Sequence, residues 1–430
     1  MTNSMQRGGL IALAVLILVL VFAARPAQAQ TFKVLHTFHY DDGWWPQGQL
    51  LLDTAGDIYG ITNLGGYPPC SYYQQGCGTV FKLSKNGKQV WLHSFDGPNG
   101  FSPSGGLLRN SAGEMFGVTN QGGKRVGSGG ACQDGCGLIY ELDQAGKKET
   151  VLHKFTGIPL AGGYAPGGLL IEDSSGTFYG TTGSGGVNYG VVFKMSQSGK
   201  ETVLYTFQGG ADGYGPGSGV IEDSRGNLFG TTVYGGNGGC GSAGCGVVFE
   251  VVPGGKETVL YAFTGETDGG IASSSLIQDQ SGNLYGTTAY GGSIQTYICD
   301  GNEGCGVVYE VSPNGSETVL YAFCSQPPCS DGHRPYGLIR DAAGNLYGVT
   351  LFGGNASCGA QEGCGVVFKV EPTGKEIVLH AFTGGKDGAY PEGQLVMDTA
   401  GNLYGTASSG GDISCEPRYG GCGVLFKITP

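Results

Sequence analysis

The sequence predicts an all-β protein, a seven-bladed β-propeller built from four-stranded antiparallel blades. Its basis is a phrase of the form Gly-x-x-aromatic-Gly, which occurs seven times. Its second glycine stands at positions 60, 117, 180, 230, 286, 348 and 405, so successive copies are 50–63 residues apart. Self-similarity at such a period is typical of propellers and solenoids. The two ends of the chain, described below, favour the propeller.

Each repeat contains four short strand candidates separated by turn signals. In residues 337–382 these candidates are 337–340, 346–350, 366–370 and 376–382. The first two are joined by Asp-Ala-Ala-Gly-Asn, whose aspartate can accept hydrogen bonds from the backbone of its own turn. Helical periodicity is absent after the N-terminal segment. Four antiparallel strands per repeat, with seven repeats, is the composition of a propeller.

The chain ends indicate a closed ring. The last repeat stops after its third strand, at "GVLFKITP", and residues 32–38, "FKVLHTF", resemble the fourth strand "KEIVLHAF". We expect residues 31–38 to pair with the C-terminal blade as its outermost strand, which removes an open sheet edge. A solenoid would instead need capping repeats.

The recurring residues of each repeat have a structural interpretation. We expect the aromatic residue of the phrase to fill the space between blades, and its second glycine to admit a bulky residue of a neighbouring blade. We interpret the acid or amide that opens the preceding turn as turn chemistry. It recurs as Asp53, Asn110, Asp173, Asp223, Asp279, Asp341 and Asp398.

The first 29 residues are typical of a secretory signal peptide. Arg7 precedes an apolar run over residues 10–24, and Ala27-Gln28-Ala29 offers a cleavage site. We therefore expect residues 30–430 to form a single propeller domain, secreted or periplasmic, with no membrane insertion after cleavage. The formal net charge of −12 argues against nucleic acid and anionic membranes as partners.

Fourteen cysteines fall in the sequence as close pairs. Six repeats carry "GCG" before the third strand, and the third repeat lacks both partners at once. Zinc sites usually hold tighter spacings than these, so disulfides in an exported protein are the favoured interpretation. The expected pairs are Cys70–Cys77, Cys132–Cys136, Cys240–Cys245, Cys299–Cys305, Cys324–Cys329, Cys358–Cys364 and Cys415–Cys422.

Binding residues are expected on one face of the ring, where the loops between strands two and three and those between blades are long. The loops between blades follow a frame close to D-G-x-x-P-x-G and lead toward the channel mouth. Aromatic rings there can stack on sugars or hold a cation, although packing between blades is the alternative. The candidates are Trp44, Trp45, Phe101, Tyr164, Tyr214, His333, Arg334 and Tyr390.

The acids of the same loops allow a second hypothesis, in which carboxylates converge at the axis for catalysis or hold calcium. Their shared Asp-Gly context is also explained by turn chemistry. No nucleophile elbow, HExxH or P-loop is present. Apart from this calcium alternative, the sequence predicts no cofactor or metal. The five acids are Asp42, Asp212, Asp268, Asp331 and Asp387.

The motifs "GNLYGTT", the following "GG" and "GVVFKVSPNGSETVLYAF" in its variants resemble the GloVer repeat of exported bacterial proteins, over residues 31–430. More distantly, D-x-x-G-N-L-Y is similar to the second strand of NHL-type propellers. The resemblance implies secreted or cell-surface placement and no established activity.

Our leading hypothesis from the sequence is a secreted, disulfide-stapled propeller that binds an extracellular glycan or a surface protein through its long-loop face. An enzyme acting on a polysaccharide or a lactone is the first alternative, and it would use the channel-mouth carboxylates. A structural subunit of an extracellular assembly is the second alternative.

Overall fold

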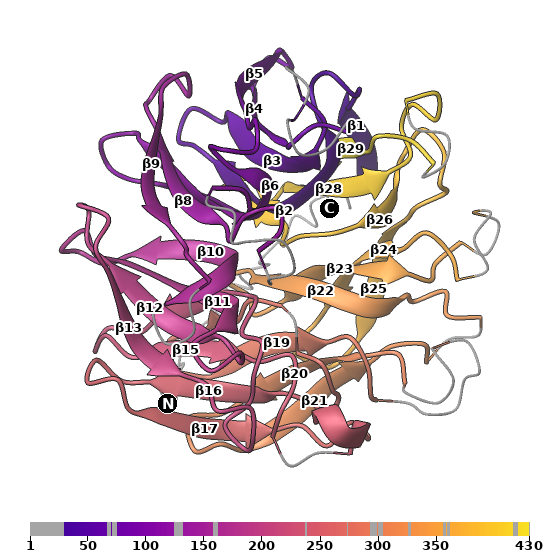
Figure 1. Cartoon of the computed structure of the whole chain (residues 1–430). Helices are drawn as coiled ribbons and strands as arrows, with labels where there is room; N and C mark the ends of the chain where they lie inside the picture. The colour runs from indigo at the N-terminus through magenta and orange to yellow at the C-terminus, as the bar shows by residue number, and fades with distance from the viewer. Residues whose placement is uncertain are drawn as a thin grey trace, which may run out of the picture.

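The computed structural model describes residues 30–66, 70, 75–123, 132–157, 162–236, 239–272, 274–292, 299, 304–325, 328–355, 358, 362–415 and 420–429. The predicted signal peptide, residues 1–29, lies outside the described residues. The protein is all-β, with antiparallel sheets of four strands arranged around a common centre (Figure 1). None of the helices in the described ranges is long and apolar enough to cross a membrane.

The strands follow the repeats of the sequence. Within most repeats they are hydrogen-bonded in sequence order, from an innermost strand to an outermost one (Figure 1). The elements are β1 (Thr31–Thr37), β2 (Trp44–Leu52), β3 (Ile58–Leu64), β4 (Thr79–Leu83), β5 (Gln89–Ser94), β6 (Phe101–Arg109), β7 (Met115–Gln121), β8 (Leu138–Leu142), β9 (Glu149–Lys154), β10 (Gly163–Glu172), β11 (Phe178–Gly185), β12 (Val191–Met195), β13 (Glu201–Thr206), β14 (Val220–Glu222), β15 (Leu228–Thr231), the 3-10 helix η1 (Gly241–Ala243), β16 (Val247–Val251), β17 (Glu257–Ala262), β18 (Ile277–Gln278), β19 (Leu284–Thr288), β20 (Val307–Val311), β21 (Glu317–Ala322), β22 (His333–Arg340), β23 (Leu346–Phe352), β24 (Val366–Val370), β25 (Glu376–Ala381), β26 (Ala389–Pro391), β27 (Val396–Met397), β28 (Leu403–Ser409) and β29 (Val424–Thr429).

Four sheets have four consecutive strands each: β10–β13, β14–β17, β18–β21 and β22–β25. The units β2–β5 and β6–β9 are joined into one eight-stranded sheet by a single parallel bridge between Gln49 and Gly106. The remaining sheet contains both ends of the described chain. In it β1 pairs antiparallel with β29, from Thr31 opposite Thr429 to Thr37 opposite Val424, and lies at the sheet edge beyond β29 and β28. The sequence predicts this pairing.

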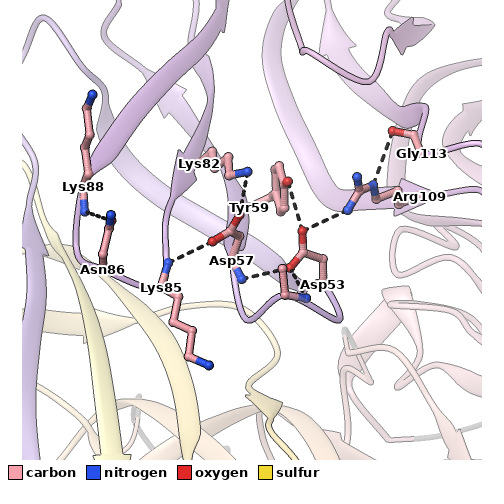
Figure 2. Close-up of polar contacts among 10 residues, drawn as sticks. Asp53, Asp57, Tyr59, Lys82, Lys85, Asn86, Lys88, Arg109 and Gly113 are labelled. Carbon is pink, nitrogen blue, oxygen red and sulfur yellow. Dashed lines mark hydrogen bonds and ion pairs between the residues drawn. The ribbon is translucent and has the colours of Figure 1, made fainter.

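The turn acids have the structural role that the sequence predicts. The Asp53 carboxylate accepts hydrogen bonds from the backbone amides of Ala55 and Asp57, at 3.0 and 2.9 Å, and from the Tyr59 hydroxyl at 3.2 Å (Figure 2). Arg109, from the next repeat, pairs with the same carboxylate at 3.0 Å (Figure 2). These contacts hold the pKa of Asp53 below its usual value although burial opposes them. The tyrosine of the repeated phrase therefore locks the turn that precedes it.

The second glycine of the phrase admits a ring of its own sheet, which corrects our expectation of a residue from a neighbouring blade. Gly60 stands opposite Phe81 in the β3–β4 pair. A Cβ built at Gly60 would lie 2.5 Å from the Phe81 ring and 2.8 Å from Leu50. Phe81 in turn packs edge-on against Phe38, with ring centroids 5.0 Å apart. The strand-three ring thus passes over the glycine and fills the space between sheets.

Backbone of successive repeats is in close contact near the centre. A Cβ at Gly105 would lie 1.9 Å from the carbonyl oxygen of Gly168, and one at Gly168 would lie 2.1 Å from the amide nitrogen of Gly219. The last repeat meets the first in the same way, because a Cβ at Gly393 would lie 2.3 Å from the carbonyl oxygen of Gly48. At these positions a side chain would push neighbouring repeats apart.

Candidate functional site

All seven disulfides are formed with the predicted partners. Six of them brace the segment before strand three, and Cys324–Cys329 instead closes the loop between β21 and β22. In several repeats a glycine of the following loop lies directly against the sulfurs. A Cβ at Gly157 would lie 2.6 Å from Cys132 Sγ, and one at Gly265 would lie 2.5 Å from Cys240 Sγ. The disulfides therefore hold the base of the long loops.

In the structure, most of the candidate residues of this loop frame lie within strands. Trp44, Trp45, Phe101, Tyr164, His333, Arg334 and Tyr390 belong to the innermost strands β2, β6, β10, β22 and β26, whereas Tyr214 forms an isolated bridge with Tyr234. From the sequence we expect these residues in the loops between blades. The hydrogen-bonded pairing of Trp44 with Leu64 and of His333 with Phe352 explains the difference, because strand two continues further than its sequence signal.

Two successive positions of this frame have opposite environments. The first position is mostly buried: Trp44 is 2 % exposed, Phe101 6 % and His333 2 %. These three rings contradict our expectation of exposed rings at the channel mouth. They pack in the core, and Trp44 belongs to the apolar cluster that joins the first, second and last repeats.

The second position turns outward because its backbone is left-handed. In five repeats its amide donates to the carbonyl of the cysteine before strand three of the preceding repeat, for example from Arg334 to Cys305 and from Tyr390 to Cys364, both at 2.9 Å. Positive φ is uncommon for residues other than glycine and is retained where surrounding structure enforces it. The residues are Trp45 (φ 61°), Ser102 (58°), Ala165 (54°), Gly215 (72°), Ile271 (59°), Arg334 (53°) and Tyr390 (54°).

Large side chains at this second position are clustered in neighbouring repeats. Trp45, Arg334 and Tyr390 come from the first, sixth and seventh repeats, whereas the positions between them hold Ser, Ala, Gly and Ile. Trp45 is 37 % exposed. Together with Tyr390 it lines a hollow of about 590 Å³.

A carboxylate, that of Glu392, lines this hollow beside Trp45. The Trp45 indole Nε1 donates to Glu392 Oε2 at 3.2 Å, and the Ser408 hydroxyl lies 3.4 Å from Glu392 Oε1. Ser408 also donates to the Tyr390 carbonyl at 2.9 Å. Burial raises the pKa of Glu392 although both hydrogen bonds oppose the shift. Glu392 was not among the sequence candidates, because the Asp-Gly acids nearby matched a motif and it did not.

A second cavity of about 400 Å³, which we call the channel, lies between the innermost strands of the sheets. Glu392 and Leu351 line both the hollow and the channel. Arg334 lies over the rings of Tyr290 and Phe352, 5.1 and 5.3 Å from their centroids. All seven repeats contribute to the channel wall, with Gln47, Ser104, Gly167, Gly217, Ser275, Tyr336 and Gln394 among its residues.

The five loop acids are bound within their own loops. Asp42 accepts from the His39 amide, and Asp387 from the Thr383 amide. Each also meets a histidine or tyrosine of the adjacent outer strand: His36 with Asp42 and His380 with Asp387 at 3.1 Å, Tyr205 with Asp212 at 2.9 Å, and Tyr261 with Asp268 and Tyr321 with Asp331 at 2.8 Å. Within the described part of the chain, the acids do not form a group of three or more that could hold a metal ion. Turn chemistry thus explains their positions, and convergence at the axis is wrong.

The family model named the Gloeobacter/Verrucomicrobia repeat matches residues 126–326 and 295–430. The chain belongs to this family. No curated protein matches it. Among solved structures, a nidogen/laminin complex is 14 % identical with a TM-score of 0.44, covering 74 % of this chain and 94 % of that one. A luciferin-regenerating enzyme is 13 % identical with a TM-score of 0.45, covering 76 % and 91 %.

Proposed function

We propose that this member of the repeat family is an exported seven-bladed propeller that binds an extracellular glycan or a surface protein at the channel mouth formed by its first, sixth and seventh repeats. Export is supported by the seven disulfides, since such bonds persist in oxidising compartments. The family resemblance points the same way.

Closure of the ring is supported by contacts between the last repeat and the first. Strand β2 lies against β27 and β28. A Cβ at Gly423 would lie 2.6 Å from Pro46, which repeats the relation between Gly365 and Pro391 in neighbouring sheets. Together with the β1–β29 pairing, these contacts support a closed ring in which the last repeat packs against the first.

The observation that carries the binding proposal is the exposed Trp45 ring, fixed over an accessible hollow. Its indole is oriented by the bond to Glu392, and its backbone is held in the left-handed region. Leaving a ring exposed forgoes roughly 1.5–3 kcal/mol of burial, and packing gives no reason for that loss. A rigid aromatic face beside hydrogen-bonding groups is suited to the apolar face and hydroxyls of a sugar.

Binding is better supported than hydrolysis. Among the described residues that line the hollow and the channel, Glu392 is the only carboxylate. Glycoside hydrolysis usually requires two carboxyl groups about 5–10 Å apart. The acids that the sequence offered as partners are occupied in their own loops.

The test compares two adjacent tryptophans. We expect Trp45→Ala to weaken retention on a glycan array or on a bacterial cell-surface fraction while the melting temperature changes little. Trp44→Ala should instead lower stability by about 3–5 kcal/mol, because it truncates a buried ring. Glu392→Gln, which keeps the shape of the hollow, should weaken binding without unfolding the protein. Unchanged binding by Trp45→Ala and Glu392→Gln would contradict the proposed site.

A further inference from the structure

A second aromatic surface lies in the part of the ring formed by the third and fourth repeats. Tyr214 stacks on Tyr234 with ring centroids 5.1 Å apart, and Tyr189 meets Tyr214 edge-on at 5.4 Å. Tyr189 is 36 % exposed and Tyr234 37 %. We call these three residues the tyrosine platform. It shares no residue with the hollow around Trp45.

The platform occupies the place of a missing disulfide. The third repeat lacks both cysteines, and a short turn from Gly185 to Gly190 stands where the others have a braced loop. In other repeats the glycine of the following loop touches sulfur atoms. At the equivalent Gly209, a Cβ would lie 2.5 Å from ring carbons of Tyr189. The Tyr189 ring therefore replaces the disulfide against that glycine and remains partly exposed.

Backbone hydrogen bonds fix all three tyrosines. Tyr214 and Tyr234 exchange both of their backbone hydrogen bonds, at 2.9 and 3.1 Å, and the Tyr189 carbonyl accepts from the Gly215 amide at 2.9 Å. Burial, together with the proximity of Tyr234 and Tyr189, raises the pKa of Tyr214. The three phenol rings thus stand in contact with one another on a fixed backbone, with apolar faces and hydroxyl edges, and such pre-organisation lowers the entropy cost of binding.

We propose that the tyrosine platform binds a pyranose ring of a neutral polysaccharide. Stacking uses the apolar face of the sugar, and the phenol hydroxyls can exchange hydrogen bonds with its hydroxyl groups. Neutral chains are favoured because the protein carries a formal net charge of −12, which repels polyanionic chains. The site deepens the proposed glycan binding by naming the class of ligand, and it stands on residues separate from those at Trp45.

Affinity electrophoresis tests the platform with xylan, β-1,3-glucan and mannan as neutral probes and alginate as the acidic one. We expect at least one neutral probe to retard the wild-type protein and alginate not to retard it. Tyr189→Ala with Tyr234→Ala should weaken that retardation about tenfold, as expected for the loss of two stacking rings. Tyr189→Phe with Tyr234→Phe should retain most of it. Val90→Ala, a control at an exposed apolar residue of β5, should behave as wild type.

A direct readout is nitration of the tyrosines, followed by peptide mass spectrometry. The retarding polysaccharide should protect Tyr189 and Tyr234 from nitration. Retardation by alginate alone, retardation by no probe, or undiminished retardation of the double alanine variant would overturn the inference. If Trp45→Ala abolishes binding and the double alanine variant does not, the channel-mouth proposal survives and the platform does not. The converse result supports the platform alone.

Discussion

Three pairs of carboxyl groups at the interfaces between neighbouring outer strands should make the stability of this protein fall as the pH rises. The glutamates stand at the first positions of β17, β21 and β25, and each lies close to an aspartate of the preceding repeat. Desolvation and the nearby aspartate raise the pKa of each glutamate to about 7. The Oε1 atom of each is buried, with no hydrogen-bond partner among the described residues. The pairs are Glu257 with Asp212, Glu317 with Asp268 and Glu376 with Asp331.

Other interfaces avoid this arrangement of two acids. Glu149 and Glu201, at the same position of β9 and β13, face His93 and His153 at 3.3 and 3.2 Å. At the start of β5 the residue is Gln89. Other repeats of the same protein therefore have either a histidine as the partner of this glutamate or a neutral glutamine in its place.

The direction of this pH dependence follows from the linkage between proton binding and folding. Below about pH 4.5 the three glutamates are protonated in both the folded and the unfolded protein, so they do not lower the free energy of unfolding. As the pH rises toward 7, they ionise first in the unfolded chain, and the native state loses stability until they ionise there too. A shift from 4.5 to about 7 corresponds to about 3 kcal/mol per carboxyl group. Solvent screening of these partly exposed groups reduces that to about 1–2 kcal/mol each.

The assay is chemical denaturation between pH 5 and 8. The triple variant Glu257→Gln, Glu317→Gln, Glu376→Gln should gain about 3–6 kcal/mol over the wild-type protein at pH 8 and little at pH 5. Glu149→Gln, at an interface that contains a histidine, should keep the wild-type dependence on pH. Parallel curves for the wild-type and triple-variant proteins would refute the reasoning, since they would place these carboxyl groups in ordinary solvent.

Three further predictions concern the scaffold. Gly168→Ala should prevent folding or lower the melting temperature strongly, because its Cβ would lie 2.1 Å from the Gly219 nitrogen, whereas Gly254→Ala, with nothing within 4 Å, should be tolerated; both are measured by thermal melts. Deleting residues 30–37 should expose the β29 edge and cause aggregation, which light scattering detects; a monomeric, equally stable product would contradict it. Replacing Cys132 and Cys136 by alanine should cost roughly 2 kcal/mol in the loop-entropy model, and the difference from wild type should vanish under reducing conditions.

Much of the fold could be predicted because repetition averages out local ambiguity. One strand candidate is weak evidence, but seven aligned copies identified the strands, their turns and the cysteine pairs. The N-terminal half of the innermost strand was the exception, as in β22, where the sequence predicts only residues 337–340 of His333–Arg340. The glycines and polar residues of that half have no strand signal, and pairing with strand two makes it extended. Tertiary context therefore decided the strands that form the candidate site.

The site itself was predicted only in part, for a reason visible in two neighbouring residues. Alternation along a strand does not say which of Trp44 and Trp45 is buried, and the left-handed backbone at Trp45 overrides simple alternation. In the equivalent residues of other repeats, a hydrogen bond from the backbone amide to the preceding repeat accompanies that conformation, and no local pattern reveals it. Glu392, Tyr189 and Tyr234 were missed because they belong to no motif that the sequence analysis used, whereas the loop frame did predict Tyr214.

Those departures are the best guide to function in a repeat protein. A position shared by all seven repeats has a role that every repeat needs, such as the aspartate or asparagine that opens the turn or the glycine beneath a strand-three ring. A binding site needs different chemistry at one place on the ring. Trp45, Tyr390 and Glu392 depart from the small residues of most other repeats, and Tyr189 departs from a disulfide. Both groups leave aromatic surface exposed on rigid backbone, which stability alone does not favour. Under the two binding proposals, selection for a ligand at these places accounts for that exposure, and the alanine variants of Trp45 and of the platform test it separately.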